Sequence, residues 1–256
     1  MANPTLSKQF GEYAAVTDAS LATAPASPFV SDTETMTISG TAARTGVLLA
    51  LVIAAGAWGW GLVDPAAGEV SIPGWWLLLV LGAFVLAIVT AFRPKLAIVT
   101  GPIYAVAMGA LVGTISHIYD AEFEGIVLQA IMATVAVFLG MLVLFVTRTI
   151  RVTNRLRGVV IGATVGIALF YLASILLSLF GVGVPLVWDS GPVGILFSAF
   201  VVVIAAFNLM LDFDMIERGV QAGAPRSLEW YGAFGLMVTI IWMYIEILRL
   251  ISKVRN

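Results

Sequence analysis

Two aspartates stand at the end of a long apolar run. The stretch NLMLDFDMIERG, residues 208–219, places Asp212 and Asp214 two positions apart, and Asp212 directly follows 21 uncharged residues (191–211). A carboxylate at the edge of an apolar helix can bind a cation or take up a proton, and either event changes the local packing. Residues two apart on a helix point about 200° apart. The two acids therefore do not share one proton, and we expect Asp212 to face the bundle and Asp214 to flank it.

Neighbours at helical spacing offer partners to both aspartates. Asn208 precedes Asp212 by one turn and is placed to hydrogen-bond it, and Arg218 follows Asp214 at the spacing of an ion pair. One interpretation is that these acids, with Glu217, cap the span at the water boundary. The other is that Asp212 lines a polar path.

A third acid, Glu246, lies within the apolar stretch IIWMYIEILRL. An acid inside a span is a functional candidate by default. Arg249 is three residues further on, so a local ion pair is available. Glu246 also lies about 24 Å along a straight helix from Trp230, which puts it near the opposite face from Asp212. A direct Asp212–Glu246 pair would need a bent or re-entrant helix; a separate polar site or a simple pair with Arg249 are the alternatives.

The only histidine, His117, follows Ser116 near the end of another apolar segment. Adjacent helical residues point about 100° apart, so these two cannot form a Ser–His dyad by themselves. We interpret His117 as an interfacial residue that could sense pH. Without cysteine and with one histidine, thiolate and His-rich metal sites are excluded.

The composition makes the bilayer the natural surroundings of these residues. The chain of 256 residues is 61% hydrophobic and 11% charged, with a mean hydropathy of +1.04, whereas soluble domains are about 45–50% apolar and about 25% charged. The balance of 13 basic and 15 acidic residues lacks the basic patch that nucleic acid requires. We expect membrane lipids as partners, no nucleic acid and no organic cofactor.

The elements that position the acids are helices that cross the membrane. Residues 1–43 are rich in Ala, Ser, Thr and Pro and predict a disordered cytosolic tail, and residues 44–256 predict a membrane domain. A spanning helix needs about 20 apolar residues. The sequence predicts about seven, near 45–63, 74–92, 97–119, 125–147, 158–181, 191–212 and 230–251.

Charges in the breaks between these spans alternate. The second, fourth and sixth breaks carry arginines or lysine, whereas the first, third and fifth, which hold Asp64 and Glu69, Asp120 to Glu124, and Asp189, carry none. The positive-inside rule then puts the N-terminus in the cytoplasm. The last span breaks the pattern, because its end carries Arg249, Lys253 and Arg255. Either packing anchors it, or it does not cross simply.

Small residues recur four positions apart in two segments. Gly109 and Gly113 form one such pair, and Gly162 and Gly166 form another. Glycines one turn apart let helix backbones approach closely in lipid. We therefore predict a helix-packing site at each pair.

Four stretches, taken in order, resemble the Bax inhibitor-1/YccA family of integral membrane proteins, over roughly residues 45–251. They are RPKLAIVTGPIYAVAMGALVGTISHIY, GIVLQAIMATVAVFLGMLVLF followed by TRTIRVTNRLRGVVIGATVGIALFYL, FNLMLDFDMIERG, and WYGAFGLMVTIIWMYIEILRLI. The long tail and the LDFD variant look most like the bacterial branch.

The resemblance implies a seven-helix fold with a central last helix. It also implies a pH-sensitive calcium leak, gated by an acidic pair on the sixth and seventh helices, and, for YccA-like members, contact with a membrane-bound protease. Asp212 takes the place of the acid on the sixth helix. Counting back from Arg249 puts Thr239, not an acid, at the corresponding place on the seventh.

These observations predict an all-α, polytopic bundle in the cytoplasmic membrane that is not an enzyme. The first hypothesis is a pH-modulated calcium or cation leak, with Asp212 as the gate residue, Asp214 and Glu246 as secondary candidates, and Asn208, Arg218, Thr239, Arg249 and His117 as further polar candidates. The rival is a regulatory protein that conducts nothing and binds a membrane protease or another integral partner. A third hypothesis is an intramembrane aspartyl protease.

Overall fold

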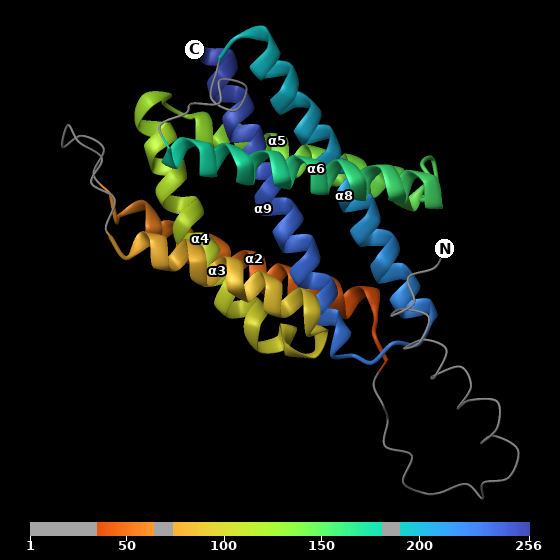
Figure 1. Cartoon of the computed structure of the whole chain (residues 1–256). Coiled ribbons are helices and arrows are strands. Elements are labelled where there is room, and N and C mark those ends of the chain that lie inside the picture. The colour runs from red at the N-terminus through yellow and green to blue at the C-terminus, as the bar shows by residue number, and fades with distance from the viewer. Residues whose placement is uncertain (1–34, 64–73, 181–189) are drawn as a thin grey trace, which may run out of the picture. The chain divides into compact units, whose positions relative to one another are not determined.

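The computed structural model describes residues 35–63, 74–180 and 190–256. Within them, seven α-helices follow one another, each matching one predicted span: α2 (Ile38–Trp60), α3 (Trp76–Phe92), α4 (Ala97–Glu122), α5 (Ile126–Val146), α6 (Asn154–Leu179), α8 (Pro192–Gln221) and α9 (Leu228–Arg255) (Figure 1). A short 3₁₀ turn, η2 (Pro94–Leu96), joins α3 to α4. Six of the helices are long and apolar enough to cross a membrane, and α3, at 17 residues, is shorter. The all-α polytopic bundle is confirmed.

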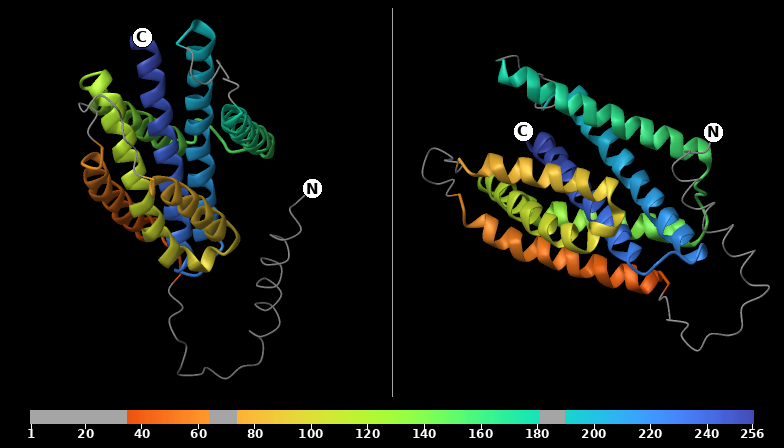
Figure 2. Two further views of the ribbon diagram at one scale, coloured as in Figure 1. Left: turned by 60° about the vertical axis from the view of Figure 1, so that its left-hand side comes forward. Right: turned by 60° about the horizontal axis from the view of Figure 1, so that its bottom comes forward.

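The last helix, α9, is central. It packs against α2, α4, α5 and α8 (Figures 1 and 2), and buried side chains occur along it from Glu229 to Lys253. The central last helix that the resemblance implies is therefore present. By contrast, α6 packs mainly on α8, through Ile167, Val201 and Ile204, and most of its apolar side chains are exposed.

The two glycine pairs have opposite surroundings. A Cβ on Gly109 would collide with the backbone of Val52, and one on Gly113 with the backbone of Gly56. The α2 and α4 backbones thus meet at these glycines, which confirms the first predicted packing site. A Cβ on Gly162 or Gly166 would meet nothing within 4 Å. The second predicted site is therefore wrong in the described chain, because that face of α6 packs on no other helix.

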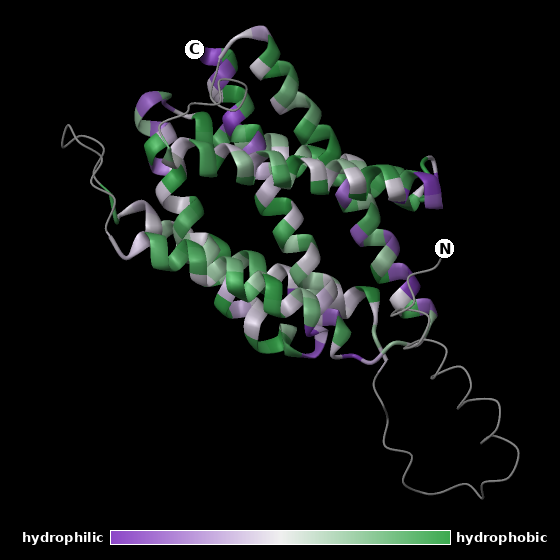
Figure 3. Ribbon diagram, in the orientation of Figure 1, coloured by the Kyte–Doolittle hydropathy of each residue, from purple (hydrophilic) through white to green (hydrophobic). Residues whose placement is uncertain are grey.

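Contacts between helix ends sort the described chain into two sides. At one side, Thr37 contacts Glu229, Arg148 contacts Glu217, and Arg157 contacts Asp214. These contacts bring together the starts of α2, α6 and α9 and the ends of α5 and α8. We call this side the basic end, because it holds Arg148, Arg151, Arg155, Arg157, Arg218 and Arg226. Figure 3 shows hydrophilic ribbon at the helix ends and mostly apolar ribbon between them.

The end of α9 lies on the opposite side. Lys253 Nζ donates a hydrogen bond to Gly194 O at the start of α8, and Arg255 donates one to Glu124 O in the turn between α4 and α5. A helix of 28 residues spans about 42 Å, and α9 runs antiparallel to α8 over this length. The last span thus reaches from one side to the other in spite of its basic end, and packing anchors it.

The first helix begins earlier than predicted. Thr37 is its N-cap, with a side chain that accepts a hydrogen bond from Gly40 N, and the helix starts at Ile38. Residues 38–43, assigned to the tail from sequence, are therefore helical. Residues 1–34 of the predicted tail lie outside the described residues. Asp64, Glu69 and Asp189, in the breaks without basic residues, also lie outside them.

Candidate functional site

Asp212 and Thr239 meet between α8 and α9. Thr239 Oγ1 donates a hydrogen bond of 2.6 Å to Asp212 Oδ2. Gly235, one turn before Thr239, lies beside the carboxylate, and a Cβ there would be in ordinary van der Waals contact with Asp212 Oδ1, at 3.5 Å. The residue that stands where the resemblance expects a second acid is therefore the direct partner of the first. The prediction that Asp212 faces the bundle agrees with this contact.

No arginine neutralises Asp212. The carboxylate is half-buried, and within the described residues it forms no ion pair. A hydroxyl donor satisfies one oxygen without removing the charge. Asp212 is consequently the acid of this helix pair that can accept a proton or a cation without first releasing a basic side chain.

Asp214 has the opposite surroundings. It is 8% exposed, and its Oδ2 lies 2.5 Å from Arg157 Nη2 of α6 and 2.9 Å from Arg218 Nε. The predicted pair with Arg218 is confirmed. The view of Asp214 as a mere flank needs correction, because it is buried and connects α8 to α6 through Arg157.

Glu246 is also held by its neighbours. It is 1% exposed, accepts a hydrogen bond of 2.8 Å from Tyr171 Oη of α6, and pairs with Arg249 at 3.0 Å. Arg249 in turn donates to Tyr171 Oη. The predicted Glu246–Arg249 pair is confirmed. Glu246 stands seven residues beyond Thr239, about 10 Å along the helix, so Asp212 and Glu246 occupy different levels.

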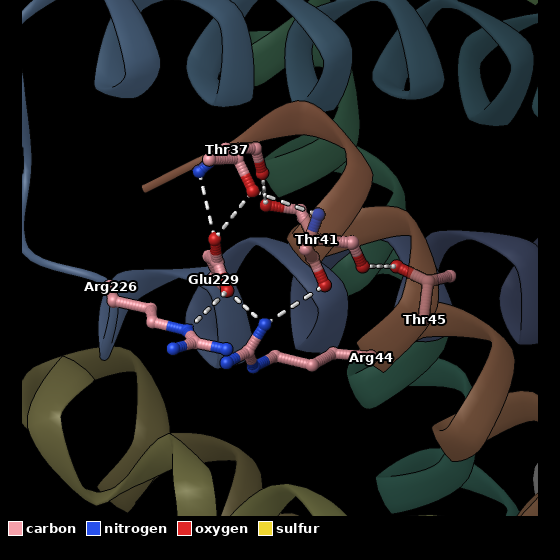
Figure 4. A network of polar contacts seen from close by, with 7 residues as sticks. Thr37, Thr41, Arg44, Thr45, Arg226 and Glu229 are labelled. Carbon is pink, nitrogen blue, oxygen red and sulfur yellow. Dashed lines mark hydrogen bonds and ion pairs between the residues drawn. The ribbon is translucent and has the colours of Figure 1, made fainter. Parts of the chain in front are cut away.

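A fourth acid, Glu229, was not among the predicted site residues. It is 1% exposed at the start of α9 and lies in a polar network with the start of α2 (Figure 4). Its Oε1 accepts hydrogen bonds of 2.8 and 2.9 Å from the backbone N and the hydroxyl of Thr37. Arg44 forms an ion pair with Oε2, and Arg226 lies 3.9 Å from it. An acid in the first turn of a helix is an ordinary partner of the helix dipole, so the long-range role of Glu229 could not be predicted from its position.

Two other predicted contacts are made with different partners. The Asn208 side-chain amide donates to Thr164 Oγ1 of α6 at 2.7 Å and to Ile204 O at 2.9 Å, so the predicted bond to Asp212 is wrong. His117 Nδ1 lies 2.8 Å from Trp60 O, and its ring stacks on Trp60. Because a carbonyl only accepts, Nδ1 carries the proton. Ser116 bonds instead to Tyr244 Oη at 2.7 Å, which leaves no Ser–His dyad.

A comparison with protein families finds a match over nearly the whole chain. The family described as Bax inhibitor 1 like matches residues 3–256. This chain belongs to the Bax inhibitor 1-like family. Searches of curated proteins and of solved structures returned no match.

In this Bax inhibitor 1-like protein, α9 carries a buried polar stripe. Thr239, Glu246 and Lys253 are spaced by seven residues, which puts them on one helix face, and they are 8%, 1% and 4% exposed. Their partners come from the neighbouring helices: Asp212 and Gly194 from α8, and Tyr171 from α6. Polar groups at three levels thus follow the α8 and α6 side of the central helix.

Apolar side chains accompany the stripe between Asp212 and Glu246. Ile204, Val201 and Ile167 pack together with Trp242 between α6, α8 and α9. Among the described residues of this Bax inhibitor 1-like protein, no group of three or more His, Asp or Glu side chains is arranged to hold a metal ion. The arrangement offers single carboxylate and hydroxyl oxygens at separate levels, with apolar packing between them.

Proposed function

We propose that this protein is a pH-modulated cation leak of the cytoplasmic membrane, that calcium is the ion, and that Asp212 is the gate residue. The observation that carries the proposal is the contrast among the acids of α8 and α9. Arginines neutralise Asp214, Glu229 and Glu246, whereas among the described residues Asp212 has only the Thr239 hydroxyl as a partner. A gate residue must change its charge or its ligand, and Asp212 can do so at the smallest structural cost.

The mechanism follows from the partners of Asp212. Ionised, it accepts the Thr239 hydrogen bond and holds α8 against α9 at this level. Protonation, or the arrival of a cation, removes the free negative charge and changes this contact. Calcium favours carboxylate, hydroxyl and carbonyl oxygens, and the stripe of α9 supplies such groups. Asp214 and Glu246 are secondary candidates, since each would first have to leave an arginine.

The proposal also covers the orientation of the chain in the membrane, its branch of the family and the absence of catalytic activity. The arginines of the basic end gather where α2 begins, which supports a cytoplasmic N-terminus by the positive-inside rule. The resemblance supports the bacterial, YccA-like branch and a passive, non-enzymatic role. None of the four acids has another acid as its hydrogen-bond or ion-pair partner in the described chain, and so we rank an aspartyl protease last.

Calcium flux into proteoliposomes tests the proposal. Wild type is compared with Asp212→Asn at pH 6 and pH 8, and Glu217→Gln is the matched control, because Glu217 lies on the same helix and pairs with Arg148 at the surface. We expect flux that changes with pH in wild type and in the control, and that loses this dependence in Asp212→Asn. Background flux in every sample would exclude the leak.

One observation favours a second candidate function. Thr239 stands where the resemblance expects an acid, so an acidic pair is not formed at the level of Asp212. A regulatory protein that binds a membrane-bound protease or another integral partner needs no such pair. For that function, Asp212→Asn would leave partner binding unchanged, which pull-down of the partner from membranes would show.

A further inference from the structure

A hollow of about 400 Å³ opens beside the turn between α5 and α6, at the basic end. Its lining combines two arginines, Arg148 and Arg151, one carboxylate, Asp214, and three apolar side chains, Phe145, Ile150 and Val152. Both arginines are exposed. The hollow is thus cationic at its rim and partly apolar in its walls.

The backbone of the turn places Arg148 in an unusual position. Helix α5 ends in a Schellman motif, with Arg148 N bonded to Phe145 O and Thr149 N to Leu144 O. The residue after the C-cap in this motif is left-handed and is usually glycine. At the end of α8 that residue is Gly223, with φ of 63°, whereas at the end of α5 it is Arg148, with φ of 57°. Arg148 therefore has a backbone conformation that favours glycine, and its side chain lines the hollow.

Contacts of the side chain fix the direction of Arg148. Its guanidinium lies 5.2 Å from the centre of the Phe145 ring and pairs with Glu217. The hydrogen bond and charge of Glu217 raise the pKa of Arg148, so it stays cationic. Asp214 is likewise occupied, by Arg157 and Arg218.

The remaining charge at the hollow is positive. Arg151 lines it and forms no ion pair within the described part of the chain. Counted over the α5–α6 turn, the first turn of α6 and the end of α8, there are five arginines (Arg148, Arg151, Arg155, Arg157 and Arg218) and two acids (Asp214 and Glu217). A site of this charge complements an anion, and the planar guanidinium fits the oxygens of a phosphate.

The exposed face of α5, the helix that ends beside the hollow, indicates where that phosphate comes from. Leu139, Val143 and Val146 are 51%, 58% and 68% exposed, and their spacing of four and three residues puts them on one face of α5. This lipid-facing stripe ends at the turn that carries Arg148. Acyl chains that lie along it would bring a headgroup to the level of the two arginines. A soluble anion would make no use of the stripe.

We propose that the hollow at the α5–α6 turn binds the phosphate of an anionic phospholipid, with Arg151 and Arg148 as its ligands and the exposed stripe of α5 under its acyl chains. The proposal depends on the chain spanning a membrane and not on conduction. It also gives a role to Arg151, which has no ion pair among the described residues, beside Arg148, which pairs with Glu217. The leaflet at the basic end supplies such lipids if it is the cytoplasmic one.

Native mass spectrometry of the full chain tests the site. The protein is released from micelles that contain equal amounts of dioleoyl phosphatidylglycerol and dioleoyl phosphatidylcholine. The amounts of protein with each lipid bound are then compared. We expect wild type to retain phosphatidylglycerol preferentially. Arg151→Gln should lower that preference about fivefold, as expected for one arginine at a charged lipid surface. The matched control is Arg155→Gln, since Arg155 is an exposed arginine of the first turn of α6, close in sequence to Arg151, that does not line the hollow, and it should stay close to wild type.

Three results would overturn the proposal. They are equal retention of both lipids by wild type, equal losses in Arg151→Gln and Arg155→Gln, and displacement of phosphatidylglycerol by the same concentration of soluble glycerol phosphate. The last would identify a site for free phosphate. Arg151→Lys keeps the charge without the planar fork and should retain an intermediate preference. Thermal unfolding of each variant in detergent separates lost binding from lost folding.

Discussion

Asp212 and Glu246 are both acids of the α8–α9 pair, yet they are held in different ways. Glu246 is 1% exposed and is fixed by Tyr171 and Arg249. Asp212 is half-buried and has one hydroxyl partner, Thr239. A buried acid that is paired with an arginine holds the structure together, because separating the pair leaves a charge without compensation. An acid with a neutral partner is free to change its charge. This difference gives Glu246 a structural role and Asp212 the role of the switch.

Removal of the arginine beside Glu246 should have the largest effect on stability. Among the described residues, Arg249→Met leaves the buried Glu246 carboxylate with only Tyr171 as donor, and loss of one partner of a buried pair costs about 3–5 kcal/mol. Thermal unfolding in detergent would show a large fall in the melting temperature. The double variant Glu246→Gln with Arg249→Met should recover part of the loss. If the single variant melted like wild type, Glu246 would not be the structural acid of the comparison.

Removal of the hydroxyl beside Asp212 should have a smaller effect. Thr239→Val has nearly the shape of threonine and leaves the Asp212 carboxylate without its donor, a change worth about 1–3 kcal/mol. The same unfolding measurement applies. The control for loss of a threonine hydroxyl is Thr164→Val, since Thr164 of α6 accepts a hydrogen bond from Asn208 of α8. A loss as large as that of Arg249→Met would remove the distinction between the two acids.

Neutralisation of Asp212 should have the smallest effect on stability. Asparagine keeps an oxygen that accepts the Thr239 hydrogen bond and leaves no arginine unpaired, so we expect Asp212→Asn to stay within about 1 kcal/mol of wild type. By contrast, Asp214→Asn weakens the pairs with Arg157 and Arg218 and should destabilise the protein more. The reverse order, measured by thermal unfolding, would contradict the assignment of Asp212 as the free acid.

Much of the fold could be predicted from the sequence, because long apolar runs and charged breaks report directly on spanning helices. The start of α2 was missed, since its first turns are polar (Ser39, Thr41, Arg44 and Thr45) and are held by Glu229, 192 residues from Thr37. The glycine pairs show the same limit. Glycines four residues apart indicate that another helix backbone can approach closely. Only the three-dimensional arrangement shows whether such a helix is present.

The site was predictable where it depends on local spacing. The pairs Asp214–Arg218 and Glu246–Arg249 follow from helical periodicity. Counting back from Arg249 pointed to the position of Thr239 on the last helix, but not to its contact with Asp212. Arg157, Tyr171 and Glu229 could not be found in this way, because they reach their partners across helices and the sequence carries no signal of register between α6, α8 and α9.

The most direct test of the account compares the two acids in one assay. Calcium flux into proteoliposomes is measured at pH 6 and pH 8 for wild type, Asp212→Asn and Glu246→Gln, each normalised to folded protein. The account predicts that wild type and Glu246→Gln respond to pH and that Asp212→Asn does not. A pH response that survives in Asp212→Asn and disappears in Glu246→Gln would contradict it, and would move the switch to the arginine-bound acid.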